Sequence, residues 1–169
     1  MSTNLTFEST SAQKSAIIVD LDGTLVDVDA IRWLVEGKKK DFDRFHLESK
    51  NSPKFDEVAR LCNFAFSLGL EIHVVSGRLM KFHELSTNWL EANEINFSSL
   101  QLRKGNDFRP DVVIKKEMFQ NLNMQNIIIA IDDKPAMREL WKQCGIKKVL
   151  DPRNFPRFQE LEEFIHTFI

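Results

Sequence analysis

Short apolar runs alternate with amphipathic stretches along most of the chain. The runs have the length of buried strands, and the stretches between them carry apolar residues at helical spacing. The predicted strands are one ending at Asp20, then 70–75, 98–102, 126–131 and 146–150. The predicted helices follow Pro53 up to Gly69, cover 79–92, 110–122 and 135–144, and close the chain after Pro156. This alternation predicts an α/β, Rossmann-like fold, in which helices cover both faces of a parallel sheet.

Two segments stand outside the alternation. Residues 2–11 include six Ser or Thr, and we predict a flexible N-terminal leader over residues 1–14. Residues 26–50 are first acidic, then basic at Lys38–Lys40, and then mix charged with aromatic side chains, which indicates a short helical excursion from the sheet. The remaining length suits one hydrophobic core, so residues 15–169 are predicted to form a single domain.

Composition narrows the function classes only modestly. Hydrophobic residues make up 43% of the chain, and the net charge of −2 excludes a global basic field that would attract nucleic acid or an anionic membrane. Cys62 and Cys144 lie in apolar contexts far apart, and we predict two reduced, buried thiols. The sequence shows neither an apolar run of membrane length nor a signal-peptide core, so we expect a soluble, cytoplasmic protein.

The first predicted strand ends in two carboxylates, Asp20 and Asp22, which are followed by Gly23 and Thr24. Side chains alternate along a strand, so residues two apart leave its end on the same side. Gly23 allows a sharp turn, and Thr24 offers a hydroxyl there. One acid can act as nucleophile or metal ligand while the other manages a proton. Because two acids this close repel each other, the pattern also favours a divalent cation.

Two further strands also end in polar, chemically competent residues. Ser76-Gly77-Arg78 follows one of them and Asp132-Asp133 follows the other, while Lys115 lies near the start of a helix after a fourth strand. Ligands of parallel sheets bind beyond the carboxyl ends of the strands. We therefore expect all of these groups to meet at one edge of the sheet.

These motifs, in this order, resemble those of the haloacid dehalogenase-like phosphohydrolase superfamily over about residues 15–150. The resemblance implies that Asp20 attacks phosphorus to form an aspartyl-phosphate, which water then hydrolyses. Asp22 would protonate the leaving oxygen and then activate the water. Ser76 and Lys115 would hold the phosphoryl oxygens, and residues at about 26–50 would form a small helical cap.

The same resemblance implies a Mg²⁺ cofactor. Its ligands would come from Asp20, from the backbone carbonyl of Asp22 and from Asp132. Asp133 would either contact the metal through water or orient Lys115.

A closer resemblance links the chain to the 3′-phosphatase domain of phage polynucleotide kinase/phosphatases. It is carried by 74–78, 107–115 and 131–141, with 41–46 similar to the cap of related phage-type phosphatases. It implies a 3′-phosphate on a polynucleotide end as substrate, bound by Thr24, Ser76, Gly77, Arg78 and Arg109. The phosphate loop of the kinase half does not occur in this sequence, which predicts a phosphatase working beside a separately made kinase or ligase.

Other interpretations stay open on the sequence alone. The substrate could instead be a nucleoside monophosphate or another small phosphoester, and a catalytically idle binding module is an alternative of another class. Lys116 competes with Lys115 for the motif lysine. Lys38–Lys40 fit a solvated loop better than a nucleic-acid contact, and Phe42, Phe45 and His46 fit cap packing better than base stacking. The sequence leaves the oligomeric state and the choice between DNA and RNA open.

Overall fold

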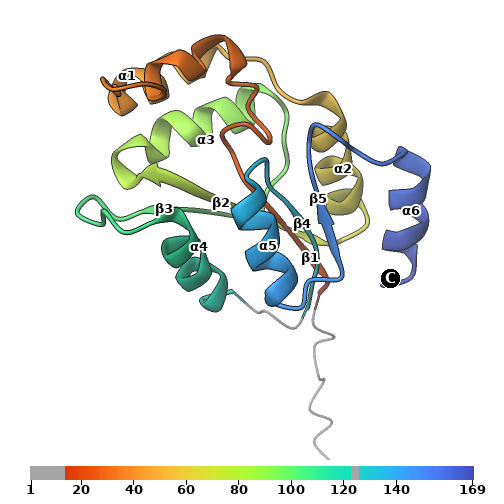
Figure 1. Cartoon of the computed structure of the whole chain (residues 1–169). Helices are drawn as coiled ribbons and strands as arrows, with labels where there is room; N and C mark the ends of the chain where they lie inside the picture. Colours follow the sequence, from red (N-terminus) through yellow and green to blue (C-terminus); the bar gives the residue numbers. More distant parts are fainter. Residues whose placement is uncertain (1–13, 123–125) are drawn as a thin grey trace, which may run out of the picture.

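The computed structural model describes residues 14–122 and 126–169. Its centre is a five-stranded parallel sheet in the order β3-β2-β1-β4-β5 (Figure 1). The strands are β1 Ala16–Val19, β2 Glu71–Leu79, β3 Ser99–Arg103, β4 Ile127–Ile131 and β5 Lys148–Leu150. Val19 pairs with Val74 on one side and with Ile131 on the other, so β1 and β4 end level with each other, while β2 continues beyond them to Leu79. The predicted α/β fold is confirmed.

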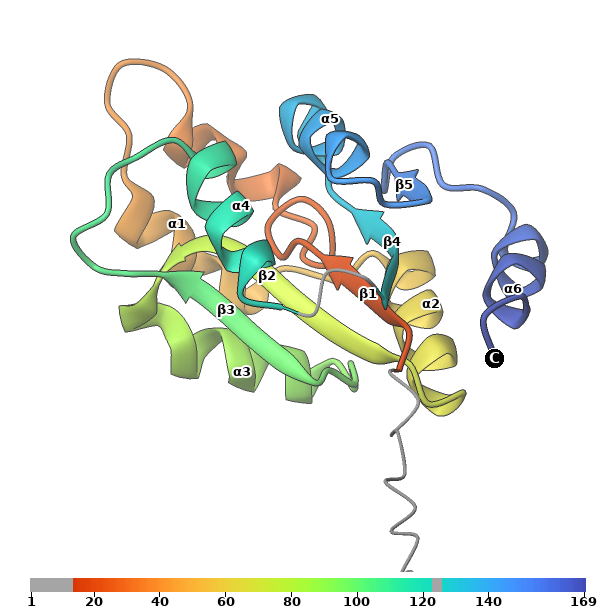
Figure 2. The same ribbon diagram turned by 90° about the horizontal axis from the view of Figure 1, so that it is seen from below.

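Helices cover both faces of the sheet (Figure 2). One face carries α2 Asp56–Ser67, α3 His83–Ala92 and α6 Phe158–His166, and the other carries α4 Asp111–Gln120 and α5 Pro135–Gln143. Along β1, Ile17 and Val19 pack in the first layer, while Ala16 and Ile18 pack in the second. All four are buried, which explains why this strand is apolar throughout rather than alternating.

The segment between β1 and α2 carries the short helical elements that the sequence indicates for 26–50. They are a 3-10 helix over Asp29–Val35, α1 Phe42–Glu48 and a 3-10 turn over Ser49–Asn51. We refer to residues 26–51 as the cap segment. Leu34 and Phe45 anchor it in the larger core cluster.

Several local features differ from the sequence-based expectations. β2 continues through Ser76-Gly77-Arg78 to Leu79, because it still pairs with β3 across an irregular register. Cys144 is only partly buried, although Cys62 is fully buried as expected. Phe42 does not pack inside the cap, since its side chain is 54% exposed, whereas Phe45 and His46 are buried. The predicted leader lies almost wholly outside the described residues.

Among residues 14–122 and 126–169, no helix has the length and apolar character needed to cross a membrane.

Candidate active site

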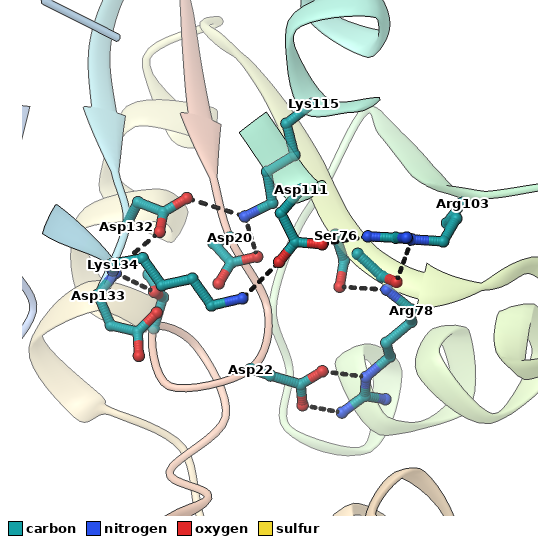
Figure 3. Close-up of polar contacts among 12 residues, drawn as sticks. Asp20, Asp22, Ser76, Arg78, Arg103, Asp111, Lys115, Asp132, Asp133 and Lys134 are labelled. Atoms are coloured by element: carbon teal, nitrogen blue, oxygen red, sulfur yellow. Dashed lines mark hydrogen bonds and ion pairs between the residues drawn. The ribbon is translucent and has the colours of Figure 1, made fainter. Parts of the chain in front are cut away.

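Asp20 and Asp22 flank the turn that follows β1. The turn is closed by the Gly23 amide, which donates to the Val26 carbonyl at 2.8 Å, and Gly23 adopts a φ of +85°. A Cβ on Gly23 would clash with Oδ2 of Asp133, so a side chain fits there only if Asp133 moves. The two carboxylates leave the strand end as predicted, but they contact different partners (Figure 3).

Lys115 joins two of the acids. Its Nζ lies 2.6 Å from Oδ1 of Asp20 and 2.8 Å from Oδ2 of Asp132, and its side chain is 1% exposed. Burial alone would lower the pKa of Lys115, but the two carboxylates outweigh it and raise the pKa above its usual value. Because Lys116 points into solvent, the geometry assigns the motif position to Lys115.

Three carboxylates are crowded together beside Lys115. Oxygen atoms of Asp20, Asp132 and Asp133 lie within 4.8 Å of one another, and Oδ1 of Asp133 is buried without a hydrogen-bond partner among residues 14–122 and 126–169. Burial raises the pKa of Asp20 to about 7, with Asp132 and Asp133 adding to the effect and Lys115 opposing it. Such an all-oxygen set with an unpaired buried oxygen fits Mg²⁺, which prefers carboxylate ligands.

Asp22 is held by a buried arginine rather than by this cluster. The Arg78 guanidinium donates to Oδ2 and Oδ1 of Asp22 at 2.7 and 2.5 Å, and further to the hydroxyls of Ser86 and Ser49 at 3.1 and 2.8 Å. Burial favours protonation of Asp22, but the charge and hydrogen bonds of Arg78 hold its pKa below the usual range. Ser49 belongs to the cap segment and Ser86 to α3, so Arg78 connects both to the acid.

A second group of charges, which sequence reasoning missed, borders the first. Arg103 at the end of β3 pairs with Asp111, and Asp111 also accepts from Lys134 Nζ at 2.5 Å. Arg103 Nε donates to the Gly77 carbonyl at 3.2 Å, and a Cβ on Gly77 would lie 2.8 Å from Oδ1 of Asp111. Asp111 stands one helical turn before Lys115, and this spacing was the only sequence signal for it.

These groups surround a cavity of about 480 Å³. Asp20, Asp22, Asp133 and 76–78 line it, together with residues of the cap segment and of the β3–α4 loop, while Lys115 and Asp132 lie buried against Asp20. The charged floor and the predicted site residues thus occupy one hollow at the carboxyl edge of the sheet.

Two predicted phosphate-binding residues do not reach the cavity. Thr24 is buried, and its hydroxyl oxygen accepts a hydrogen bond from the Asp133 amide at 3.0 Å, so it positions the backbone of Asp133. Arg109 is not among the residues that line the cavity, and its guanidinium is paired with Asp107 and Glu117. Asp133 makes no hydrogen bond to Lys115 within the described residues; Asp132 does, which removes the predicted orienting role of Asp133.

The sequence of the chain is similar to those of known proteins. Residues 14–151 match the family model of the phosphatase domain of polynucleotide kinase PNKP. An inferred bifunctional polynucleotide kinase/RNA ligase of Autographa californica nuclear polyhedrosis virus is 23% identical over 139 residues, which is 80% of this chain and 19% of that protein. The chain therefore spans about a fifth of that relative.

Solved structures show the same fold. A chain of the Pnkp1/Rnl/Hen1 RNA repair complex superposes with a TM-score of 0.70 at 23% identity, covering 83% of this chain and 43% of that one. The class C acid phosphatase of Bacillus anthracis gives a TM-score of 0.60 at 16% identity, covering 95% of this chain and 81% of that one. With the family match over most of its length, the chain belongs to the polynucleotide kinase phosphatase-domain family of the haloacid dehalogenase-like superfamily.

Proposed function

We propose that the protein is a Mg²⁺-dependent phosphomonoesterase that acts through an aspartyl-phosphate and removes 3′-phosphates from polynucleotide ends. The observation that carries the proposal is the Lys115 bridge between Asp20 and Asp132, placed beside an independently held Asp22. A nucleophile, a charge-balancing cation and a separate acid/base group are what two-step phosphoryl transfer requires.

In the first step, a carboxylate oxygen of Asp20 attacks phosphorus as the bond to the leaving oxygen breaks, and Asp22 supplies the proton to that oxygen. In the second step, Asp22 takes a proton from water, which attacks phosphorus and frees Asp20. Lys115 offsets the negative charge near the nucleophile, and Ser76 lines the same cavity. Bound by Asp20, Asp132, Asp133 and the Asp22 carbonyl, Mg²⁺ would neutralise developing charge on the phosphoryl oxygens.

Two observations favour a nucleic-acid end as the substrate. The family match is to a phosphatase domain named for polynucleotide kinase, the viral relative is named as a polynucleotide kinase and RNA ligase, and the similar structure comes from an RNA repair complex. Arg103 and Lys134 add positive charge at the cavity rim next to Asp111. A kinase or ligase would then supply the activities that accompany the phosphatase.

The test compares phosphate release from a 3′-phosphorylated oligonucleotide with release from nucleoside 3′- and 5′-monophosphates, with Mg²⁺ and after its chelation. We expect the oligonucleotide to be preferred, chelation to stop turnover, and Asp20→Asn to be inactive. Hydrolysis of mononucleotides but not of the oligonucleotide would overturn the substrate assignment. A parent protein that also leaves p-nitrophenyl phosphate intact would instead support the idle binding module.

A further inference from the structure

Two exposed aromatic rings border the same cavity as the catalytic acids. Phe108 is 90% exposed and Phe42 is 54% exposed, yet both line the hollow that contains Asp20 and Asp22. A single exposed apolar side chain is ordinary on a protein surface. Here, however, two rings from segments far apart in the sequence lie at one charged cavity. Core packing does not explain their position, because neither ring is buried in a core cluster.

The two rings come from segments on the side of the molecule toward which β2 and β3 end (Figure 1). Phe42 is the first residue of α1 in the cap segment, and the side chain of Asp41 caps that helix by accepting from the Arg44 amide at 2.9 Å. Phe108 stands in the loop between β3 and α4. The cavity therefore has an aromatic contribution from each of the two segments that overhang the sheet edge.

The loop that displays Phe108 is held on both sides of the ring. Arg103 donates to the carbonyls of Asp107 and Arg109 at 3.1 and 2.9 Å, and the Arg109 guanidinium is paired with Asp107 and Glu117. Arg109 thus fastens the loop to α4. A ring kept in solvent by a fastened loop is pre-organised to contact a ligand.

We propose that Phe108 and Phe42 form the binding site for the base of the nucleotide that carries the terminal phosphate. The inference rests on the proposed function, since the phosphate must lie at Asp20. A flat nucleobase has a π-face that stacks on an aromatic ring whatever its identity, so this site recognises that a base is present and not which base it is. The charged floor takes the phosphate, and the aromatic rim takes the nucleoside.

The experiment uses two 3′-phosphorylated oligonucleotides that differ only in their last nucleotide, which is either intact or abasic. We expect Phe108→Ala and Phe42→Ala each to lower kcat/KM on the intact substrate about tenfold, while leaving the abasic substrate unchanged. Phe108→Trp should retain activity on the intact substrate, and Phe108→Leu should not. Phe66→Ala is the matched control, because Phe66 is 39% exposed and lines a different hollow.

A binding measurement separates stacking from chemistry. In an Asp20→Asn background, a 2-aminopurine at the 3′-phosphorylated terminus should lose fluorescence on binding, and Phe108→Ala should remove that quenching. Equal losses on intact and abasic substrates, or no loss on either, would overturn the stacking site while leaving the phosphatase assignment intact. A parent protein that hydrolyses only small phosphoesters would overturn the proposed function as well.

Discussion

Arg78 and Lys115 are both almost fully buried beside carboxylates, and each holds a different acid. Lys115 sits in a crowd of three carboxylates, where burial raises the pKa of Asp20 to about 7. Arg78 pairs with one acid, Asp22, through two hydrogen bonds, and the pKa of Asp22 stays below its usual range. The pKa values of two acids two residues apart are therefore shifted in opposite directions. The shifts of the metal-free site suit Asp22 as the base of the second step; for the first step Asp20 must lose its proton and Asp22 must gain one.

Replacing Arg78 tests whether it positions Asp22 or binds substrate. Lysine keeps the charge but cannot form the two-pronged contact, so Arg78→Lys should lower kcat by about 10²-fold or more, as loss of general acid/base catalysis does, with little change in KM. Steady-state kinetics on the 3′-phosphorylated oligonucleotide measures the split. Ser86→Ala removes one hydrogen bond to Arg78 and should have a much smaller effect. A raised KM with unchanged kcat would mean that Arg78 binds the substrate phosphate.

Gly23 and Gly37 provide a matched pair for the turn after β1. Both have positive φ, at +85° and +73°, but only Gly23 faces a neighbour, Asp133. Gly37→Ala should cost about 1 kcal/mol of unfolding free energy from backbone conformation alone. Gly23→Ala should cost clearly more and weaken Mg²⁺ binding, because its Cβ displaces Asp133. Denaturant unfolding and Mg²⁺ titration check both, and equal stability of the two variants would contradict the close contact.

At the scale of elements, hydrophobic pattern was sufficient for most of the fold. The buried run of β4 and the amphipathic faces of α2 and α6 lie where periodicity places them, within a few residues. The end of β2 was not predictable, because 76–78 are polar by composition and extend the strand only through pairing with β3. Local pattern carries no information about such a partner.

The candidate site also has one part that the sequence predicts and one part that it does not. Asp20, Asp22, Lys115 and Asp132 follow strand ends or a helix start, so topology alone brings them together. The prediction that Arg109 binds substrate was wrong because its guanidinium is paired with Asp107 in its own loop and with Glu117 in α4. Sequence spacing does not show whether an arginine pairs with such neighbouring acids or with a substrate. The Arg103–Asp111–Lys134 group depends on side-chain contacts between β3, α4 and the loop before α5, and these appear only in three dimensions.

Helix α1 carries a buried histidine that makes its docking sensitive to acid. The His46 ring lies against Phe45 and Phe82, with centroids 5.2 and 4.9 Å apart, and its Nδ1 is 3.6 Å from Oδ2 of Asp22. Burial lowers the pKa of His46 from 6.5 to about 4, against the attraction of Asp22. The unfolded chain therefore takes up a proton below about pH 6.5 that the native state refuses until about pH 4, so stability falls as the pH falls through this window.

His46→Gln isolates this contribution. Between about pH 7 and about pH 4.5, the parent should lose about 2 to 3 kcal/mol more unfolding free energy than the variant. Denaturant unfolding at both pH values measures the difference, which cancels the titration of other groups. Parallel losses in the two proteins would show that His46 is protonated in the native state.

At the scale of the whole molecule, stability and the site are linked through the carboxylates. Asp20 has a raised pKa in the native protein, so the folded state retains a proton that the unfolded chain releases above its ordinary pKa of 3.8. In the absence of metal, this group makes the protein less stable as the pH rises from about 4 toward about 7. A bound cation offsets this loss of stability because it stabilises the ionised acids. Since the cation binds only the folded cluster, its binding free energy stabilises every element that supports the cluster.

Mg²⁺ should therefore raise the unfolding temperature, and more strongly at higher pH. Metal binding requires Asp20 to lose its proton, so with its pKa at about 7 the dissociation constant should fall about tenfold from about pH 6 to about pH 8. At a Mg²⁺ concentration 100 times that constant, the gain in unfolding free energy is about 2.7 kcal/mol.

Calorimetric titration at both pH values and thermal unfolding test this prediction, and Asp133→Asn is expected to weaken Mg²⁺ binding. Asp43→Asn is the control, since Asp43 is an exposed acid paired with Lys81 outside the cluster. A dissociation constant that does not change with pH would contradict the raised pKa of Asp20, and an unfolding temperature that ignores Mg²⁺ would contradict the metal site itself.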